Sequence, residues 1–167
     1  GAVDDDNAYA MGGVAPHAGL FGTALEVAAV GRALCAAWHG GGLVSREVVR
    51  RFFARTAVPG STRALGWDTL AAESSSAGAR FPHPAVGHLG YTGCSIWLAP
   101  ARGLVVVLLS NRVHPSAENE RIRELRPRLH DARGRRVLHR IGGRRRLGPA
   151  RRGRGQGRLR DAHPGAA

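Results

Sequence analysis

The residues best placed to do chemistry lie in one stretch of the chain, between Gly87 and Asn111. This stretch contains two or three consecutive strand patterns, and the first of them opens with the triplet His88-Leu89-Gly90. A glycine inside a strand usually marks a bulge or a point where the backbone comes close to another group. The histidine adds a titratable, hydrogen-bonding side chain beside that point. The triplet indicates one wall of an active site, although a lone His-x-Gly also occurs by chance.

Other motifs of enzyme chemistry are missing from the sequence. The eight histidines and two cysteines show no metal-ligand spacing, and there is neither a phosphate-binding glycine loop nor a Gly-x-Ser-x-Gly elbow. All 25 basic residues are arginines. Without lysine, a Schiff base or a Ser-x-x-Lys nucleophile motif cannot be formed by this chain. We therefore expect no metal and no cofactor.

Helices are predicted in the first part of the chain. Residues 1–23 are rich in glycine and other small residues, which favours an ordered loop. Thr23 and Glu26 form the pattern of a capping box, and apolar residues follow at helical spacing until the glycines at 40–42. Ser45 is a second N-cap candidate in front of another amphipathic segment.

Strands and a last helix are predicted after residue 60. Residues 63–69 have the pattern of one short strand, followed by the strands between Gly87 and Asn111. Pro115 and Ser116 begin a helix that should turn Ile122, Leu125 and Leu129 inward, and Pro127 is expected to kink or end it. Helices followed by a meandering antiparallel sheet predict an α+β fold with helices flanking the sheet.

The net charge of +13 is concentrated at the C-terminal end. Residues 1–130 hold 13 arginines against 10 acidic residues, whereas residues 131–167 hold 12 arginines against two aspartates. We divide the chain there into a folded part and an Arg/Gly-rich tail, which we predict to be disordered because it carries too little apolar surface to fold. For the tail, three alternatives remain open: a nucleic-acid-binding arm, a contact with an anionic surface and an out-of-frame extension. Since the tail lacks stacking aromatic residues, we do not expect a nucleic-acid partner.

The longest apolar run, 104–109, is too short to span a bilayer.

The order of several separated segments resembles that of a known family. The segments are Asp5-x-Asn7-Ala8, Gly12-Gly-Val-Ala15, His17-Ala-Gly-Leu-Phe-Gly-Thr23, Leu65-Gly-Trp67, Gly87-His-Leu-Gly-Tyr-Thr-Gly93 and Leu104 to Pro115. They resemble, over roughly residues 3–131, the C-terminal half of the serine β-lactamase-like hydrolases, which include class C β-lactamases, penicillin-binding proteins and esterases. The resemblance implies part of a β-lactamase/transpeptidase-like fold.

The resemblance also implies roles for the residues of the triplet. In that family a Lys-Thr-Gly or His-x-Gly motif lines one wall of the site, and here it matches His88-Leu89-Gly90. His88 would help bind a substrate carboxylate or support the proton network, and Gly90 would let substrate pair closely with the strand. The backbone N–H of Tyr91 would be one oxyanion donor.

Three further residues are placed on the same wall as substrate-binding candidates. These are Leu89, Thr92 and Asn111. For Thr92 a plain polar position in the sheet is the alternative, and for Asn111 the alternative is simple strand termination.

The family's other two motifs have no match in this chain. The nucleophile motif Ser-x-x-Lys needs lysine, and neither Tyr9 nor Tyr91 is followed two residues later by asparagine, as a Tyr-x-Asn motif requires. We therefore interpret the chain as a fragment of a serine hydrolase that is inactive alone. Its full-length parent would act on an amide, lactam or ester in a small molecule or a peptidoglycan-like substrate, in the periplasm or outside the cell. A basic nucleic-acid-binding module and a catalytically dead scaffold homologue are the competing hypotheses.

Overall fold

A five-stranded antiparallel sheet forms the centre of the computed structural model, which describes residues 1–142 and the side chains of residues 1–132. The strands follow one another in chain order across the sheet. They are β1 (Arg63–Ala64), β2 (Trp67–Thr69), β3 (Val86–Leu89), β4 (Ser95–Ala99) and β5 (Leu104–Leu108). The helices are α1 (Asp6–Ala10), α2 (Ala24–Trp38), α3 (Arg46–Phe53), the 3₁₀ turn η1 (Pro100–Arg102) and α4 (Ile122–Gly142). This arrangement confirms the α+β class.

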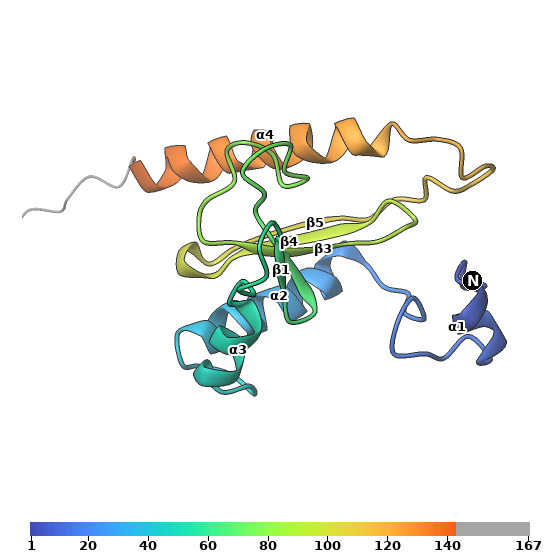
Figure 1. Cartoon of the computed structure of the whole chain (residues 1–167), viewed down its shortest axis with the longest axis horizontal. Coiled ribbons are helices and arrows are strands. Elements are labelled where there is room, and N and C mark those ends of the chain that lie inside the picture. The colour runs from blue at the N-terminus through green and yellow to red at the C-terminus, as the bar shows by residue number, and fades with distance from the viewer. Residues whose placement is uncertain (143–167) are drawn as a thin grey trace, which may run out of the picture.

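Helices cover both faces of the sheet (Figure 1). On one face, α2 and α3 pack against Val86 and Leu98, which belong to one cluster of buried residues. On the other face, a second cluster around Trp97 and Phe81 lies between the sheet and α4, with Leu129 of α4 packed against it. The alternation of side chains along β4 therefore supplies both cores.

The predicted starts of α2 and α3 are confirmed by their caps. Thr23 and Glu26 form the capping box, with the Thr23 N–H donating to Glu26 Oε2 at 2.7 Å. Ser45 caps α3 by accepting from the Val48 N–H at 3.3 Å. Within α2, Gly31 is needed for close packing, because a Cβ there would lie 2.7 Å from Val105 Cγ1 and 2.9 Å from Leu98 Cδ2.

Two predictions about the first 70 residues were wrong. Residues 1–23 are not entirely loop, since Asp5 accepts a hydrogen bond from the Ala8 N–H at 2.8 Å and so caps the short helix α1. Residues 63–69 form two strands instead of one. Gly66 adopts a φ of 74°, which is the left-handed conformation that lets the chain turn back between β1 and β2.

The last helix also differs from its prediction. It begins at Ile122 instead of near Pro115, and it continues through Pro127 to Gly142. Residues 131–142 are therefore helical, although they belong to the tail predicted to be disordered; the rest of that tail, 143–167, lies outside the described residues. Leu125 is 48% exposed, and the side chains buried beneath the helix are Ile122, Arg126 and His130.

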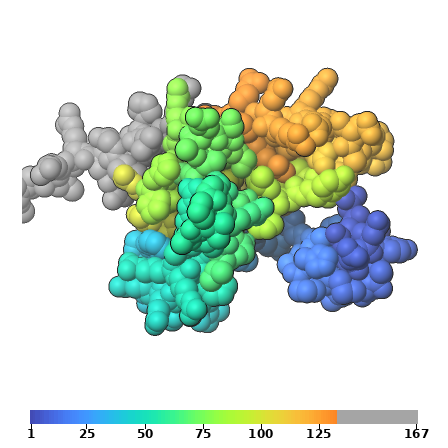
Figure 2. All heavy atoms as spheres, in the orientation of Figure 1, coloured from blue at the N-terminus to red at the C-terminus, as the bar shows by residue number. Residues whose placement is uncertain are grey.

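The N-terminal segment carries much exposed apolar surface. In Figure 2 it forms a lobe beside the rest of the molecule, at the blue end of the colour scale. Val14, Leu20, Phe21 and Leu25 are between 68% and 95% exposed. Among the residues that the structure describes, no helix has the length and apolar character needed to cross a membrane.

Gly87 gives a test of the sheet's packing. It lies opposite Trp97 in the β3–β4 register, and a Cβ at Gly87 would overlap the buried indole ring. We expect Gly87→Ala to lower the free energy of unfolding by about 2 kcal/mol or more, as overpacked cores do. Gly41→Ala is the control, because its Cβ would meet nothing nearer than the Ala36 carbonyl oxygen at 3.7 Å. Urea unfolding that shows equal stability for the two variants would contradict this packing argument.

Candidate functional site

The triplet singled out from the sequence lies where β3 becomes an open edge. β3 pairs with β4 along its whole length, from Val86 to Leu89. On its other side β3 pairs with β2 only at Val86 and Gly87. Within the described part of the chain, His88 and the residues that follow it thus lack a strand partner on the β2 side. An extended peptide can bind to such an edge through main-chain hydrogen bonds.

His88 is available to an external group. Its side chain is exposed and makes no hydrogen bond or ion pair with another described residue. In the β3–β4 register His88 lies opposite Ile96, on the face of the sheet covered by α2 and α3. Leu89 points to the opposite face and is half-buried. Within the triplet, His88 is therefore exposed, whereas Leu89 is partly packed against the protein.

The turn after β3 is closed by its own backbone. The Gly90 N–H donates to the Cys94 carbonyl at 2.8 Å, and the Gly93 N–H donates to the Gly90 carbonyl at 3.1 Å. Gly93 has a φ of 102°, and a Cβ there would overlap Ser110 Oγ. Glycine at position 93 therefore allows both the positive φ of the turn and its close contact with Ser110, just after β5.

A buried arginine of α4 donates hydrogen bonds to the carbonyls of this turn. Arg126 is 7% exposed, and its Nη2 donates to the carbonyls of Gly90 at 2.8 Å and Cys94 at 3.0 Å. Its Nε donates to the Gly93 carbonyl at 3.2 Å. This residue is not among those predicted from the sequence. The signal was its position four residues after Ile122, on the stripe of α4 that faces the sheet.

A second arginine, on the segment after β5, contacts the more exposed side of the same turn. Arg112 Nε donates to the Tyr91 carbonyl at 2.7 Å, and its guanidinium carbon lies 4.5 Å from the centroid of the Tyr91 ring. The same guanidinium donates from Nη1 to the Ala117 carbonyl at 2.6 Å. Arg112 therefore links the turn to the connection that leads into α4.

The other two predicted substrate-binding residues make local contacts. The Thr92 hydroxyl lies 3.7 Å from Cys94 Sγ, and the Thr92 carbonyl accepts from the Arg112 N–H at 2.9 Å. Asn111 is exposed and lies beyond the end of β5, where its amide oxygen accepts from the His114 N–H at 3.2 Å. Both residues thus belong to the same end of the sheet, and both are engaged in turn structure there.

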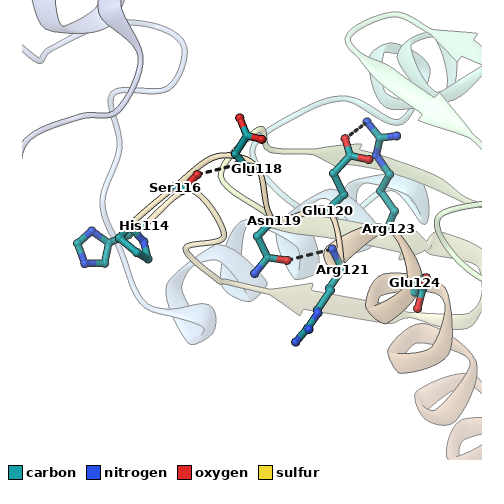
Figure 3. A pocket seen from close by; sticks show the side chains of 9 residues that line it. His114, Ser116, Glu118, Asn119, Glu120, Arg121, Arg123 and Glu124 are labelled. Atoms are coloured by element: carbon teal, nitrogen blue, oxygen red, sulfur yellow. Dashed lines mark hydrogen bonds and ion pairs between the residues drawn. The ribbon is translucent and has the colours of Figure 1, made fainter.

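A pocket opens in the connection between β5 and α4 (Figure 3). Its lining comes from the single segment His114 to Glu124. The side chains there interact with close neighbours in the sequence, as in the ion pair of 2.7 Å between Glu120 and Arg123. Among the side chains that the structure describes, no group of three or more His, Cys, Asp or Glu residues is placed to hold a metal ion.

A family model matches most of the chain and so identifies its family. The family model described as "Beta-lactamase" matches residues 1–129. The chain belongs to the beta-lactamase family. A search of solved structures finds no significant match.

Several curated bacterial proteins are similar to most of this chain. A protein named "Putative D-alanyl-D-alanine carboxypeptidase" from Escherichia coli O157:H7 is 33% identical over 122 residues, which are 68% of this chain and 27% of that protein. Proteins of the same name from Salmonella agona and Salmonella typhi are 31% identical over 130 residues, which are 73% of this chain and 29% of each relative. The chain thus spans less than a third of the length of the relatives it matches.

A buried histidine lies next to the arginine that holds the turn. His130 is fully buried, with Nε2 3.2 Å from Ser95 Oγ, at the start of β4. Burial lowers the pKa of His130 to about 4, and the positive charge of Arg126 acts in the same direction, while Asp131 opposes it. His130 is therefore neutral at pH 7.

This histidine should make stability depend on pH. The unfolded chain binds a proton at His130 near pH 6.5 but the folded chain only near pH 4, so stability is fully present above about pH 6.5 and falls as the pH is lowered. The full difference is roughly 3 kcal/mol. We expect His130→Gln to abolish this part of the loss between about pH 7 and about pH 5 in urea unfolding. His83→Gln, at an exposed histidine, is the control, and an unchanged pH dependence in His130→Gln would refute the assignment.

Proposed function

We propose that this chain forms one wall of a serine hydrolase site that cleaves an amide, lactam or ester bond. In this proposal His88 contacts a substrate carboxylate or supports proton transfer, and Gly90 lets the substrate lie along β3. The Tyr91 N–H donates to the oxyanion that forms on the attacked carbonyl. Leu89, Thr92 and Asn111 contact the substrate beside them.

The observation that carries the proposal is the open edge of β3. The edge starts at His88, and it runs directly into a turn whose Tyr91 N–H donates no hydrogen bond to another described residue. A substrate paired with this edge would bring its backbone beside that N–H and beside the free imidazole. Membership of the beta-lactamase family supports the same chemistry.

The nucleophile has to come from other residues of the complete site. This chain has no lysine, so it cannot supply a Ser-x-x-Lys motif, and it covers only 27–29% of the length of its curated relatives. The exposed apolar side chains before α2, such as Leu20 and Phe21, are consistent with a surface that more protein would cover. The names of the relatives favour peptides that end in D-alanyl-D-alanine as the substrate class.

The chain alone should therefore lack turnover. Purified residues 1–167 are expected to leave nitrocefin and short-chain nitrophenyl esters unhydrolysed above the rate of a buffer control. The measurement is continuous absorbance with the folded state checked by circular dichroism. Turnover that disappears after treatment with a serine-directed acylating inhibitor would contradict the proposal.

A chimera tests the positive part of the proposal. Residues 1–129 would replace the matching segment of the Escherichia coli relative, and hydrolysis of a D-alanyl-D-alanine peptide would be measured. We expect the chimera to be active and His88→Ala to lower its kcat/KM by roughly tenfold to a hundredfold, which is the effect of one hydrogen bond to a charged group.

His83→Ala is the matched control for that experiment, because this histidine is also exposed but lies outside the triplet. A folded chimera without activity would argue against the proposed function. Equal activity of the His88→Ala and His83→Ala variants would remove His88 from the site.

A further inference from the structure

The turn between β3 and β4 has all its carbonyls engaged. Each of the five carbonyl groups from Gly90 to Cys94 accepts at least one hydrogen bond. Every one of the five has a donor from Arg112 or Arg126, counting the Arg112 backbone N–H. By contrast, the N–H groups of Tyr91 and Thr92 donate to no other described residue. All the acceptors of the turn are thus bonded, while two of its donors, the N–H groups of Tyr91 and Thr92, have no partner among the described residues.

The orientation of one peptide unit decides where the Tyr91 N–H points. The Gly90 carbonyl and the Tyr91 N–H belong to the same planar trans unit, so they point in opposite directions. The carbonyl is held by Arg126 Nη2 at 2.8 Å and by the Gly93 N–H at 3.1 Å. Fixing this carbonyl toward α4 therefore directs the Tyr91 N–H away from α4.

Arg126 also brings a charge to this peptide unit. The guanidinium is buried, and no carboxylate lies within ion-pair distance of it among the described residues. Its partners are the three carbonyl dipoles of the turn. A cationic donor on a carbonyl polarises the peptide, and the N–H at the other end becomes a stronger donor. The positive charge is retained on burial because a guanidinium does not lose its proton in proteins.

We propose that Arg126 is the positioning residue for the oxyanion donor: it orients and polarises the Gly90–Tyr91 peptide so that the Tyr91 N–H is ready for an anionic oxygen. Arg112 holds the next peptide from the outside by its bond to the Tyr91 carbonyl. The role of Arg126 rests on the proposed function, because it supports the donor of that same site. A purely structural tie between α4 and the turn is the competing explanation.

Amide NMR of the full chain separates the two explanations. Arg126→Met keeps the length of the side chain and removes its donors and charge. We expect the Tyr91 amide proton to move upfield by tenths of a part per million, because the peptide is no longer polarised. Arg126→Lys, which restores a charged donor, should recover part of that shift. Arg123→Met is the control, since Arg123 is exposed on the same helix and its ion pair is with Glu120, away from the turn.

The wild-type chain provides a second measurement that needs no variant. Hydrogen exchange should protect the N–H groups of Gly90 and Gly93, which are bonded within the turn, and leave the Tyr91 N–H unprotected. Protection of Tyr91 would overturn the proposal even if Arg126→Met failed to fold. A Tyr91 shift in Arg126→Met no larger than in the Arg123→Met control would overturn it as well.

The chimera distinguishes this inference from the proposed function. In an active chimera, Arg126→Met should lower kcat by about tenfold or more with little change in KM, because the donor acts on the transition state. An active chimera with unchanged kcat in Arg126→Met would refute the positioning role and leave the function standing. An inactive chimera would count against the function, while the amide shifts and exchange would still decide whether Arg126 orients the peptide.

Discussion

The contact between a buried guanidinium and three backbone carbonyls determines the shape of the candidate site. Arg126 comes from the last helix, and the carbonyls of Gly90, Gly93 and Cys94 come from a turn more than 30 residues earlier. A buried charge is tolerated only where its donors are satisfied, and a turn can supply several acceptors at once because its carbonyls are not used by strand pairing. Helix and turn therefore stabilise each other, and the open edge of β3 ends against a fixed support.

The sheet itself depends on close approaches that only glycine allows. Gly31 lets α2 lie against Leu98 and Val105 on one face, and Gly87 lets the Trp97 indole cover β3 on the other. These two contacts fix the strand whose last residues carry His88. Packing against Trp97 thus explains Gly87, the glycine in front of the histidine. Gly90 has different surroundings, since a Cβ there would lie 3.3 Å from Cys94 Cβ, within the turn. A single motif of the sequence combines a packing glycine with a turn glycine.

Local signals explain what could be predicted from the sequence. The caps at Thr23 and Ser45 act over three residues, so the starts of α2 and α3 were predictable. The meander of β3, β4 and β5 followed from apolar runs and the turn at 100–103. The buried face of α4 was predicted correctly at Ile122 and Leu129 but not at Leu125, Arg126 and His130, because the last two are buried by partners on a distant turn and strand. Apolar periodicity assigned Leu125 to the inside, and no local pattern could reveal the carbonyls that make Arg126 a better fit there.

The two buried polar residues of α4 are electrically coupled, and this coupling links stability to the site. Arg126 is always charged, so it helps keep His130, one helical turn away, neutral. A protonated His130 would add a second positive charge beside that of Arg126. Among the described residues, no carboxylate forms an ion pair with either side chain. Protonation of His130 would therefore place two positive charges one helical turn apart in the buried face of α4, which lowers the stability of the folded chain. The charge of Arg126 thus acts on two neighbours at once: it polarises the carbonyls of the turn and it keeps His130 neutral.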